Sequence, residues 1–106
     1  MKRAEVRIHN IRAGELIERG ANVFTFQYDA NYRDSAISLT MPVREEPYDY
    51  DGFPPFFDGL LPEGIQLDGL LRINKIDQYD YFEQMVATGA DLVGAVTVHP
   101  IVTADE

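Results

Sequence analysis

The chain has 106 residues, of which 45% are hydrophobic, and carries 18 Asp and Glu against nine Lys and Arg, for a net charge of −9. This length and apolar content predict one globular domain, residues 1–106, with a single core, and they exclude a largely disordered chain. The acidic charge argues against direct nucleic-acid binding, which depends on Lys and Arg, and the lack of Cys excludes a disulfide framework, a thiolate metal site and a thiol nucleophile.

The N-terminal part predicts three strands. They span Glu5–His9, Arg12–Glu18 and Val23–Tyr28, with apolar side chains on alternate positions of the first and third. Arg19–Asn22 supplies turn residues between the second and the third. Connections this short join neighbouring antiparallel strands, so we expect a meander.

Residues 29–62 predict one more strand and a helical turn. Ile37–Met41 alternates apolar and polar residues and is predicted to be the fourth strand, whereas the acidic Val43–Gly52 is interpreted as a loop. Pro55 is predicted to open a short helical turn, because proline tolerates the first helical position, and Pro62 to end it.

The C-terminal part predicts a helix and a returning strand. Residues 78–88 have an apolar stripe of Phe82, Met85 and Val86, with Asp77 or Asp80 as the N-cap and Gly89 as a left-handed stop. Leu92–His99 is predicted to be a strand. Leu67, Leu70 and Leu71 have helical spacing, but Gly69 weakens that prediction. The predicted fold class is α+β, a small antiparallel sheet formed by the meander and the C-terminal strand with two or three short helices, and residues 101–106 are expected to be a frayed tail.

The chain shows no sequence signal for a membrane. No apolar run reaches the roughly 20 residues that a spanning helix needs. Met1–Val6 leads straight into alternating polar and apolar residues, without the apolar stretch of a signal peptide. We therefore expect a cytoplasmic protein with no membrane partner.

Catalytic motifs are missing from the sequence. There is no G-x-x-x-x-G-K-[ST] phosphate loop, no G-x-G-x-x-G fingerprint and no G-x-S-x-G elbow. His9 and His99 fall on the polar faces of their predicted strands, which is typical of surface residues, and no third ligand for a zinc site is evident. We expect a protein that is not an enzyme and that has no cofactor and no metal.

One alternative of a different class remains open. Asp49, Asp51, Asp58 and Glu63 have the chemistry of a paired-carboxylate or calcium site. Their spacing does not match the D-x-[DN]-x-[DN]-G calcium loop, although Asp49–Gly52 contains a fragment of it. The alternative is a small-ligand-binding or metal-binding α+β domain.

The most informative stretch runs from Phe53 to Gly64. It is too rich in Phe and Leu for a solvent loop and too interrupted by Pro and Gly for a regular strand or a long helix. It is therefore either part of the chain's own core or a docking surface. From Glu45 to Asp68 there are seven carboxylates and no Lys or Arg, which indicates a solvated acidic face or a surface matched to a basic partner.

Five blocks of the sequence together resemble a known family. They are Gly14-Glu15-Leu16, Phe24-Thr25-Phe26-Gln27-Tyr28, Ile37-Ser38-Leu39-Thr40-Met41-Pro42, Phe56-Phe57-Asp58-Gly59-Leu60-Leu61-Pro62-Glu63-Gly64 and Gly89-Ala90-Asp91-Leu92-Val93-Gly94-Ala95-Val96. In this order, over roughly Glu5 to Pro100, the chain resembles the N-terminal subdomain of HipA-type serine/threonine kinase toxins. The fourth and fifth blocks are specific together and weak singly.

The resemblance implies a function without catalysis. In the family, a larger kinase core carries the ATP site, the catalytic Asp and the magnesium ligands. A free-standing copy is similar to the HipS antitoxins of HipB–HipS–HipT systems, which implies binding to a HipT-like kinase in trans, with a HipB-like helix-turn-helix protein as a second candidate partner in a ternary complex. A regulatory N-terminal fragment of a full-length HipA-like kinase is the alternative within the family.

The segment that begins at Phe53 is expected to dock on the kinase and to obstruct its ATP site or the closure of its glycine-rich loop. Relatives often carry Trp directly after the Leu-Leu-Pro-Glu-Gly block, where this chain has Ile65 and contains no Trp. The candidate partner-binding residues are the apolar anchors, their charged flanks and the prolines and glycines between them: Phe53, Phe56, Phe57, Asp58, Leu60, Leu61, Pro62, Glu63, Gly64 and Ile65.

Overall fold

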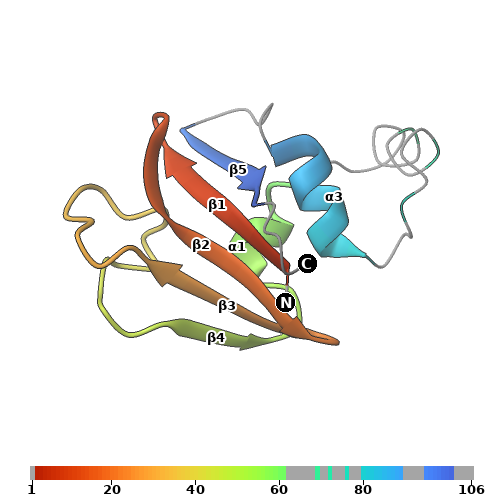
Figure 1. The fold of residues 1–106 in the computed structure, drawn as a ribbon, viewed down its shortest axis with the longest axis horizontal. Coiled ribbons are helices and arrows are strands. Elements are labelled where there is room, and N and C mark those ends of the chain that lie inside the picture. The colour runs from red at the N-terminus through yellow and green to blue at the C-terminus, as the bar shows by residue number, and fades with distance from the viewer. Residues whose placement is uncertain are drawn as a thin grey trace.

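The computed structural model describes residues 2–61, 69, 72, 76, 80–89 and 95–101. This part of the chain forms a five-stranded antiparallel sheet with helices packed on it, which confirms the predicted α+β class (Figure 1). The sheet order is β4-β3-β2-β1-β5. The strands are β1 (Lys2–Ile8), β2 (Ile11–Gly20), β3 (Val23–Tyr28), β4 (Tyr48–Asp51) and β5 (Val96–Pro100), and the helices are α1 (Pro55–Asp58) and α3 (Tyr81–Thr88).

The predicted meander is confirmed for β1, β2 and β3, with one difference at its first turn. His9 was expected in a strand, but it lies in the turn between β1 and β2, where His9 has a φ of 48° and Asn10 a φ of 68°. Two consecutive residues with positive φ form the tight hairpin turn that matches the twist of the flanking strands. The backbone N–H of His9 donates to the carbonyl of Ala95 at 2.9 Å, which ties this turn to the start of β5.

The returning C-terminal strand is also confirmed over its described part. β5 pairs antiparallel with β1, so that Val98 lies opposite Val6 and His99 opposite Glu5. Val6 and Val98 are fully buried on one face of the sheet, and the His99 ring lies on the other face beside Thr97. Residues 92–94 of the predicted strand lie outside the described residues.

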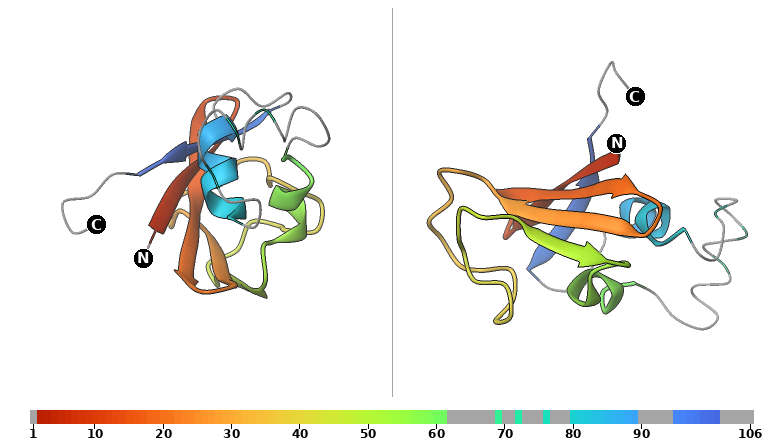
Figure 2. Two further views of the ribbon diagram at one scale, coloured as in Figure 1. Left: turned by 90° about the vertical axis from the view of Figure 1, so that its right-hand side faces the viewer. Right: turned by 90° about the horizontal axis from the view of Figure 1, so that it is seen from below.

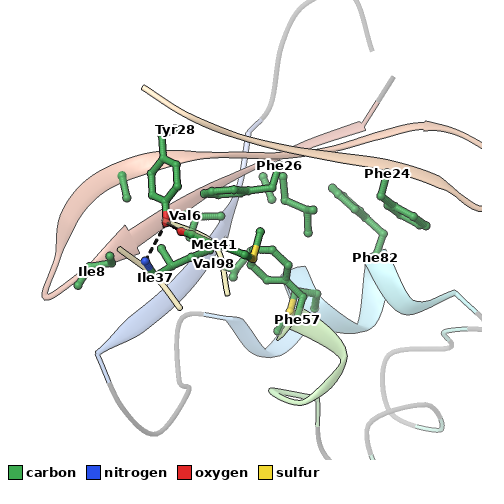
Figure 3. Packing of buried hydrophobic residues seen from close by; sticks show 14 of the residues in the cluster. Val6, Ile8, Phe24, Phe26, Tyr28, Ile37, Met41, Phe57, Phe82 and Val98 are labelled. Atoms are coloured by element: carbon green, nitrogen blue, oxygen red, sulfur yellow. Dashed lines mark hydrogen bonds between the residues drawn. The ribbon is translucent and has the colours of Figure 1, made fainter. Parts of the chain in front are cut away.

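The predicted strand over Ile37–Met41 is wrong. The segment forms only an isolated bridge between Ser38 and Met41. Ile37 and Met41 are buried at its two ends, and Leu39 is fully exposed. The backbone finds a side-chain partner in place of a neighbouring strand: the Tyr28 hydroxyl accepts from the Ile37 N–H at 2.9 Å and donates to the Met41 carbonyl (Figure 3).

The fourth strand lies instead in the segment that we interpreted as a loop. β4 pairs with β3, with Tyr48 opposite Phe26 and Tyr50 opposite Phe24. Tyr48 and Tyr50 are half-buried against the core, and Asp49 and Asp51 are exposed. The alternation is therefore that of an edge strand, but it covers only four residues of an acidic segment.

Helix α3 begins at one of the two predicted N-caps, and its C-terminal end differs from the prediction. Asp80 is the N-cap and accepts from the Glu83 N–H at 3.3 Å, as one of the two predicted caps, while Asp77 and the predicted start at residue 78 lie outside the described residues. Gly89 does not adopt the predicted left-handed stop, because its φ is −60°. A Cβ atom on Gly89 would lie 2.1 Å from the Val98 carbonyl oxygen, so this glycine permits α3 to approach β5.

The core lies between the sheet and the two helices, which pack on the same face of it (Figures 2 and 3). Phe57 of α1 and Phe82 and Met85 of α3 meet Phe24 and Phe26 of β3 there. No helix among the described residues combines the length and the apolar character required to cross a bilayer.

Replacing Tyr28 by Phe is expected to lower the free energy of unfolding by about 1–3 kcal/mol, because it leaves two buried backbone groups without a partner. Tyr48→Phe is the matched control, since the Tyr48 hydroxyl bonds the Pro42 carbonyl at the exposed edge. Urea denaturation followed by circular dichroism measures both. Equal midpoints for the two variants would show that the hydroxyl of Tyr28 does not hold the 37–41 loop.

Candidate docking surface

The segment around α1 is attached to the core at two points. Phe57 is fully buried, with its ring centroid 5.8 Å from that of Phe26, and Pro54 is buried directly before the helix. Pro55 occupies the start of the helix, where its missing N–H costs no hydrogen bond. Backbone bonds from the Leu60 N–H to the Phe57 carbonyl at 3.0 Å and from Leu61 to Asp58 at 3.2 Å continue the turn beyond the helix.

The remaining predicted anchors on this segment are only partly covered. Phe53, Phe56, Leu60 and Leu61 are half-buried and pack against the rim of the core. Asp58 and Gly59 are exposed between them. We refer to these four residues and Asp58, that is Phe53, Phe56, Asp58, Leu60 and Leu61, as the docking surface.

Phe57 therefore has a different place from the one that the sequence suggested. It was predicted as an anchor for a partner, but its side chain is 0% exposed and lies among core residues (Figure 3). A side chain so placed can contact a partner only if α1 leaves the sheet. Phe56 and Phe57 are neighbours on one helical turn and their rings are in edge-to-face contact, with centroids 5.2 Å apart, but only Phe57 is fully buried.

Phe53 joins the docking surface to both layers of the fold. Its ring lies edge-on to that of Phe24 of β3, with the ring centroids 5.2 Å apart. It is tilted relative to the ring of Tyr81 of α3, with centroids 5.8 Å apart. Tyr81 is half-buried and was not among the predicted site residues. Its position at the start of a helix carries no signal of its own, because only the fold brings it to Phe53.

The last four predicted partner-binding residues, Pro62, Glu63, Gly64 and Ile65, lie outside the described residues, as do Leu67, Leu70 and Leu71 of the weakly predicted helical turn. The structure thus places five members of the predicted set together as the docking surface and a sixth, Phe57, beneath it. Their role toward a partner stays a prediction.

Exposed carboxylates occur on α1, on β4 and in the chain before β4. Asp49 and Asp51 on β4 and Asp58 on α1 are exposed, and so are Glu45 and Glu46 before β4. Within the described ranges, none of these five forms an ion pair. Asp49 accepts a hydrogen bond from the Thr25 hydroxyl at 2.7 Å.

On the outer face of β1 and β2, by contrast, the charges are paired. Arg12 contacts Asp29 at 2.8 Å, Glu5 at 2.9 Å and Glu15 at 2.5 Å. Hydrogen bonds from Arg7 and Arg12 lower the pKa of Glu5 below its usual value, and the hydrogen bond to Asp29 raises the pKa of Arg12. Such pairs at a partly exposed surface are worth about 0–1 kcal/mol each. The carboxylates of Asp49, Asp51 and Asp58 on β4 and α1 thus lack the ion pairs that Glu5 and Glu15 form on β1 and β2.

The carboxylates do not come together as a metal site in the part of the chain that the structure describes. Asp49 and Asp51 share the outer face of β4, and no three His, Asp or Glu side chains converge there on one point. His9 and His99, which were predicted to be surface residues, lie in the first turn and on β5.

Comparison with known proteins gives a consistent picture. Residues 4–99 match the family model described as the HipA N-terminal domain. A protein of Haemophilus influenzae described as uncharacterized is 31% identical over 75 residues, which is 71% of each chain. A solved structure titled N-terminal domain of HipA toxin superposes with a TM-score of 0.76 at 24% identity, covering 97% of this chain and 95% of the other.

Proposed function

The chain belongs to the HipA N-terminal domain family, and from this membership together with the docking surface we propose that it is a non-catalytic, HipS-like antitoxin. It binds a HipT-like serine/threonine kinase in trans and inhibits it. The docking surface covers an apolar region of the kinase and obstructs its ATP site or the closure of its glycine-rich loop.

The observation that carries the proposal is the two-sided structure of the α1 segment. Phe57 fixes the segment in the chain's own core, while Phe56, Leu60 and Leu61 remain partly open to solvent on the same short turn. An anchor that is already held in place loses little conformational entropy when a partner covers it, which favours tight binding. Aromatic residues surrounded by polar ones are typical of the centre of an interface.

The charge distribution supports a basic partner surface. The unpaired carboxylate of Asp58 belongs to the docking surface, and those of Asp49 and Asp51 lie on the outer face of β4, shortly before it in the chain. Opposite charge on the kinase speeds encounter and disfavours wrong partners, and its effect weakens as salt is added. We expect the association rate to fall with ionic strength more than the dissociation rate rises.

The test is a double substitution, Phe56→Ala with Leu60→Ala, assayed with a HipT-like kinase. Loss of two central anchors is expected to weaken binding by about 700-fold, because anchors of this kind contribute about 2 kcal/mol each and every 1.4 kcal/mol is about tenfold in affinity. Isothermal titration calorimetry gives the affinity, and the rate of ATP consumption in the presence of each variant gives the inhibition.

Leu39→Ala is the matched control, since Leu39 is the most exposed large apolar residue among those described and lies on the 37–41 loop, outside the docking surface. It should bind and inhibit like the parent chain. Thermal melting of all variants separates lost contact from lost folding. A folded double variant that still inhibits fully, or a Leu39→Ala chain that fails to bind, would contradict the proposed surface.

A further inference from the structure

A cavity of about 400 Å³ opens at the end of the sheet where β3 leads into the 29–47 connection. Its wall combines Gln27, Asp29 and Arg33 with Val43, Arg44 and Glu45. The first three come from the end of β3 and the chain after it, and the last three from the chain that leads to β4. The cavity is separate from the docking surface, with which it shares no residue.

The two arginines of the cavity are positioned by neutral partners. Arg44 donates to the carbonyls of Glu46 and Pro47, each at 3.1 Å, and its guanidinium lies 3.6 Å from the centre of the Tyr48 ring. Arg33 donates to the carbonyls of Ala30 at 3.0 Å and Tyr32 at 2.9 Å. Neither forms an ion pair within the described ranges, so both keep their charge and some of their five N–H donors for another acceptor.

Two carboxylates line the same cavity. Asp29 is held by Arg12 at 2.8 Å, and Glu45 forms no ion pair with another described residue. The position of Glu45 is fixed through its backbone, since its carbonyl accepts from the Gln27 side-chain amide at 3.2 Å. The cavity thus offers the guanidinium donors of Arg33 and Arg44 and the carboxylate of Glu45, and its four charged side chains sum to zero.

This balance selects among ligands. A phosphate dianion would find two guanidinium groups but would also face Glu45 and a chain of net charge −9. A small cation would face both arginines. A ligand with one carboxylate and one ammonium group matches both signs, and the apolar Val43 and Ala30 leave room for a short aliphatic side chain.

We propose that this cavity binds a zwitterionic ligand of the free α-amino acid class. The carboxylate of the ligand contacts Arg33 and Arg44, its ammonium group contacts Glu45, and its side chain lies against Val43. The proposal does not depend on the docking surface or on the kinase. Occupancy would stabilise the 29–47 connection, because the ligand bridges its two ends.

The test is an NMR titration of the purified, ¹⁵N-labelled chain with L-leucine, followed on the amide signals of Gln27, Ala30 and Val43. N-acetyl-L-leucine lacks the ammonium group and L-leucinamide lacks the carboxylate. Each is expected to bind at least about tenfold more weakly than leucine, because each leaves one charged group of the cavity without its partner. Glu45→Gln should weaken the binding of leucine, because it removes the partner of the ammonium group and leaves the contacts of the carboxylate with the arginines in place.

Arg33→Gln and Arg44→Gln should each weaken leucine binding by about tenfold or more. Arg72→Gln, at an exposed arginine outside the cavity, is the matched control and should leave it unchanged. If Arg44→Gln alters amide signals across the sheet, the substitution has changed the structure. Leucine binding by the Arg33→Gln variant is then the measurement that tests the proposal. The proposal is overturned if leucine shifts none of the cavity amides at about 50 mM, a concentration that would reveal even millimolar affinity, if the arginine variants bind it as the parent does, or if inorganic phosphate shifts the same amides more strongly.

Discussion

Phe57→Ala is expected to lower the free energy of unfolding by about 3–5 kcal/mol, the usual loss for a buried Phe replaced by Ala. Phe57 is fully buried and packs on Phe26 in the centre of the core, so the substitution leaves a cavity between α1 and the sheet. Domains of this size are stable by only about 5–15 kcal/mol, and the variant should therefore be partly unfolded near its parent's working temperature.

Phe56→Ala is the control, because it changes the same residue type one position earlier on the same helix. Phe56 is half-buried, and the expected loss is below about 2 kcal/mol. Urea denaturation of both variants, with the slope of the transition compared, measures the difference. Equal losses would mean that α1 does not sit on the sheet in the way described, and the docking experiment at Phe56 would then lose its basis.

Gly89→Ala is expected to cost about 3 kcal/mol or more, at the upper end of the range for an overpacked site. The added Cβ would lie 2.1 Å from the Val98 carbonyl oxygen and 2.7 Å from the Val98 Cβ. Both atoms belong to β5, which is paired with β1 and cannot yield locally. Relief therefore requires α3 to move away from the sheet, which would expose Phe82 and Met85.

Gly20→Ala is the matched control for this substitution. Gly20 ends β2, and a Cβ there meets no atom within 4 Å. Its stability should change by about 0.5 kcal/mol or less. Thermal and urea unfolding of the pair give the comparison. A Gly89→Ala chain as stable as Gly20→Ala would show that α3 and β5 are not in close contact.

The parts of the fold that could be predicted from the sequence are those with a repeated local pattern. β3 was predicted with its observed bounds, because Phe24, Phe26 and Tyr28 alternate with exposed or polar residues over a full strand. Helix α3 was likewise predicted from its N-cap Asp80 and from the helical spacing of Phe82 and Met85.

The errors came from residues whose partners are distant in the sequence. Ile37–Met41 has the alternation of a strand, yet its backbone groups bond the hydroxyl of Tyr28, nine and thirteen residues away. Gly89 was assigned to a left-handed turn on local grounds, whereas its reason is the approach of Val98. Local patterns contain no information on either contact.

The candidate site shows the same division. The Phe53–Gly64 cluster stands out by composition, and the sequence left open whether it belongs to the chain's own core or to a docking surface; the structure has Phe57 in the core. That this is Phe57 rather than Phe56 depends on where a single helical turn meets the sheet, and a turn of four residues is too short to define a face by its periodicity. The charges of the 29–47 cavity could not be foreseen either, because Arg33 and Arg44 line the same cavity only through the folding of a connection that forms no strand or helix.

The sheet order has a consequence for synthesis on the ribosome. β1 is made first but needs β5, about ninety residues later, on one of its two sides. Until then the nascent chain presents one open hydrogen-bonding edge on β1, with Val6 and Ile8 lacking part of their cover. Contacts so remote along the chain slow the final step of folding. A nascent chain stalled before β5 is thus the state in which this protein is most prone to pair with the wrong strand.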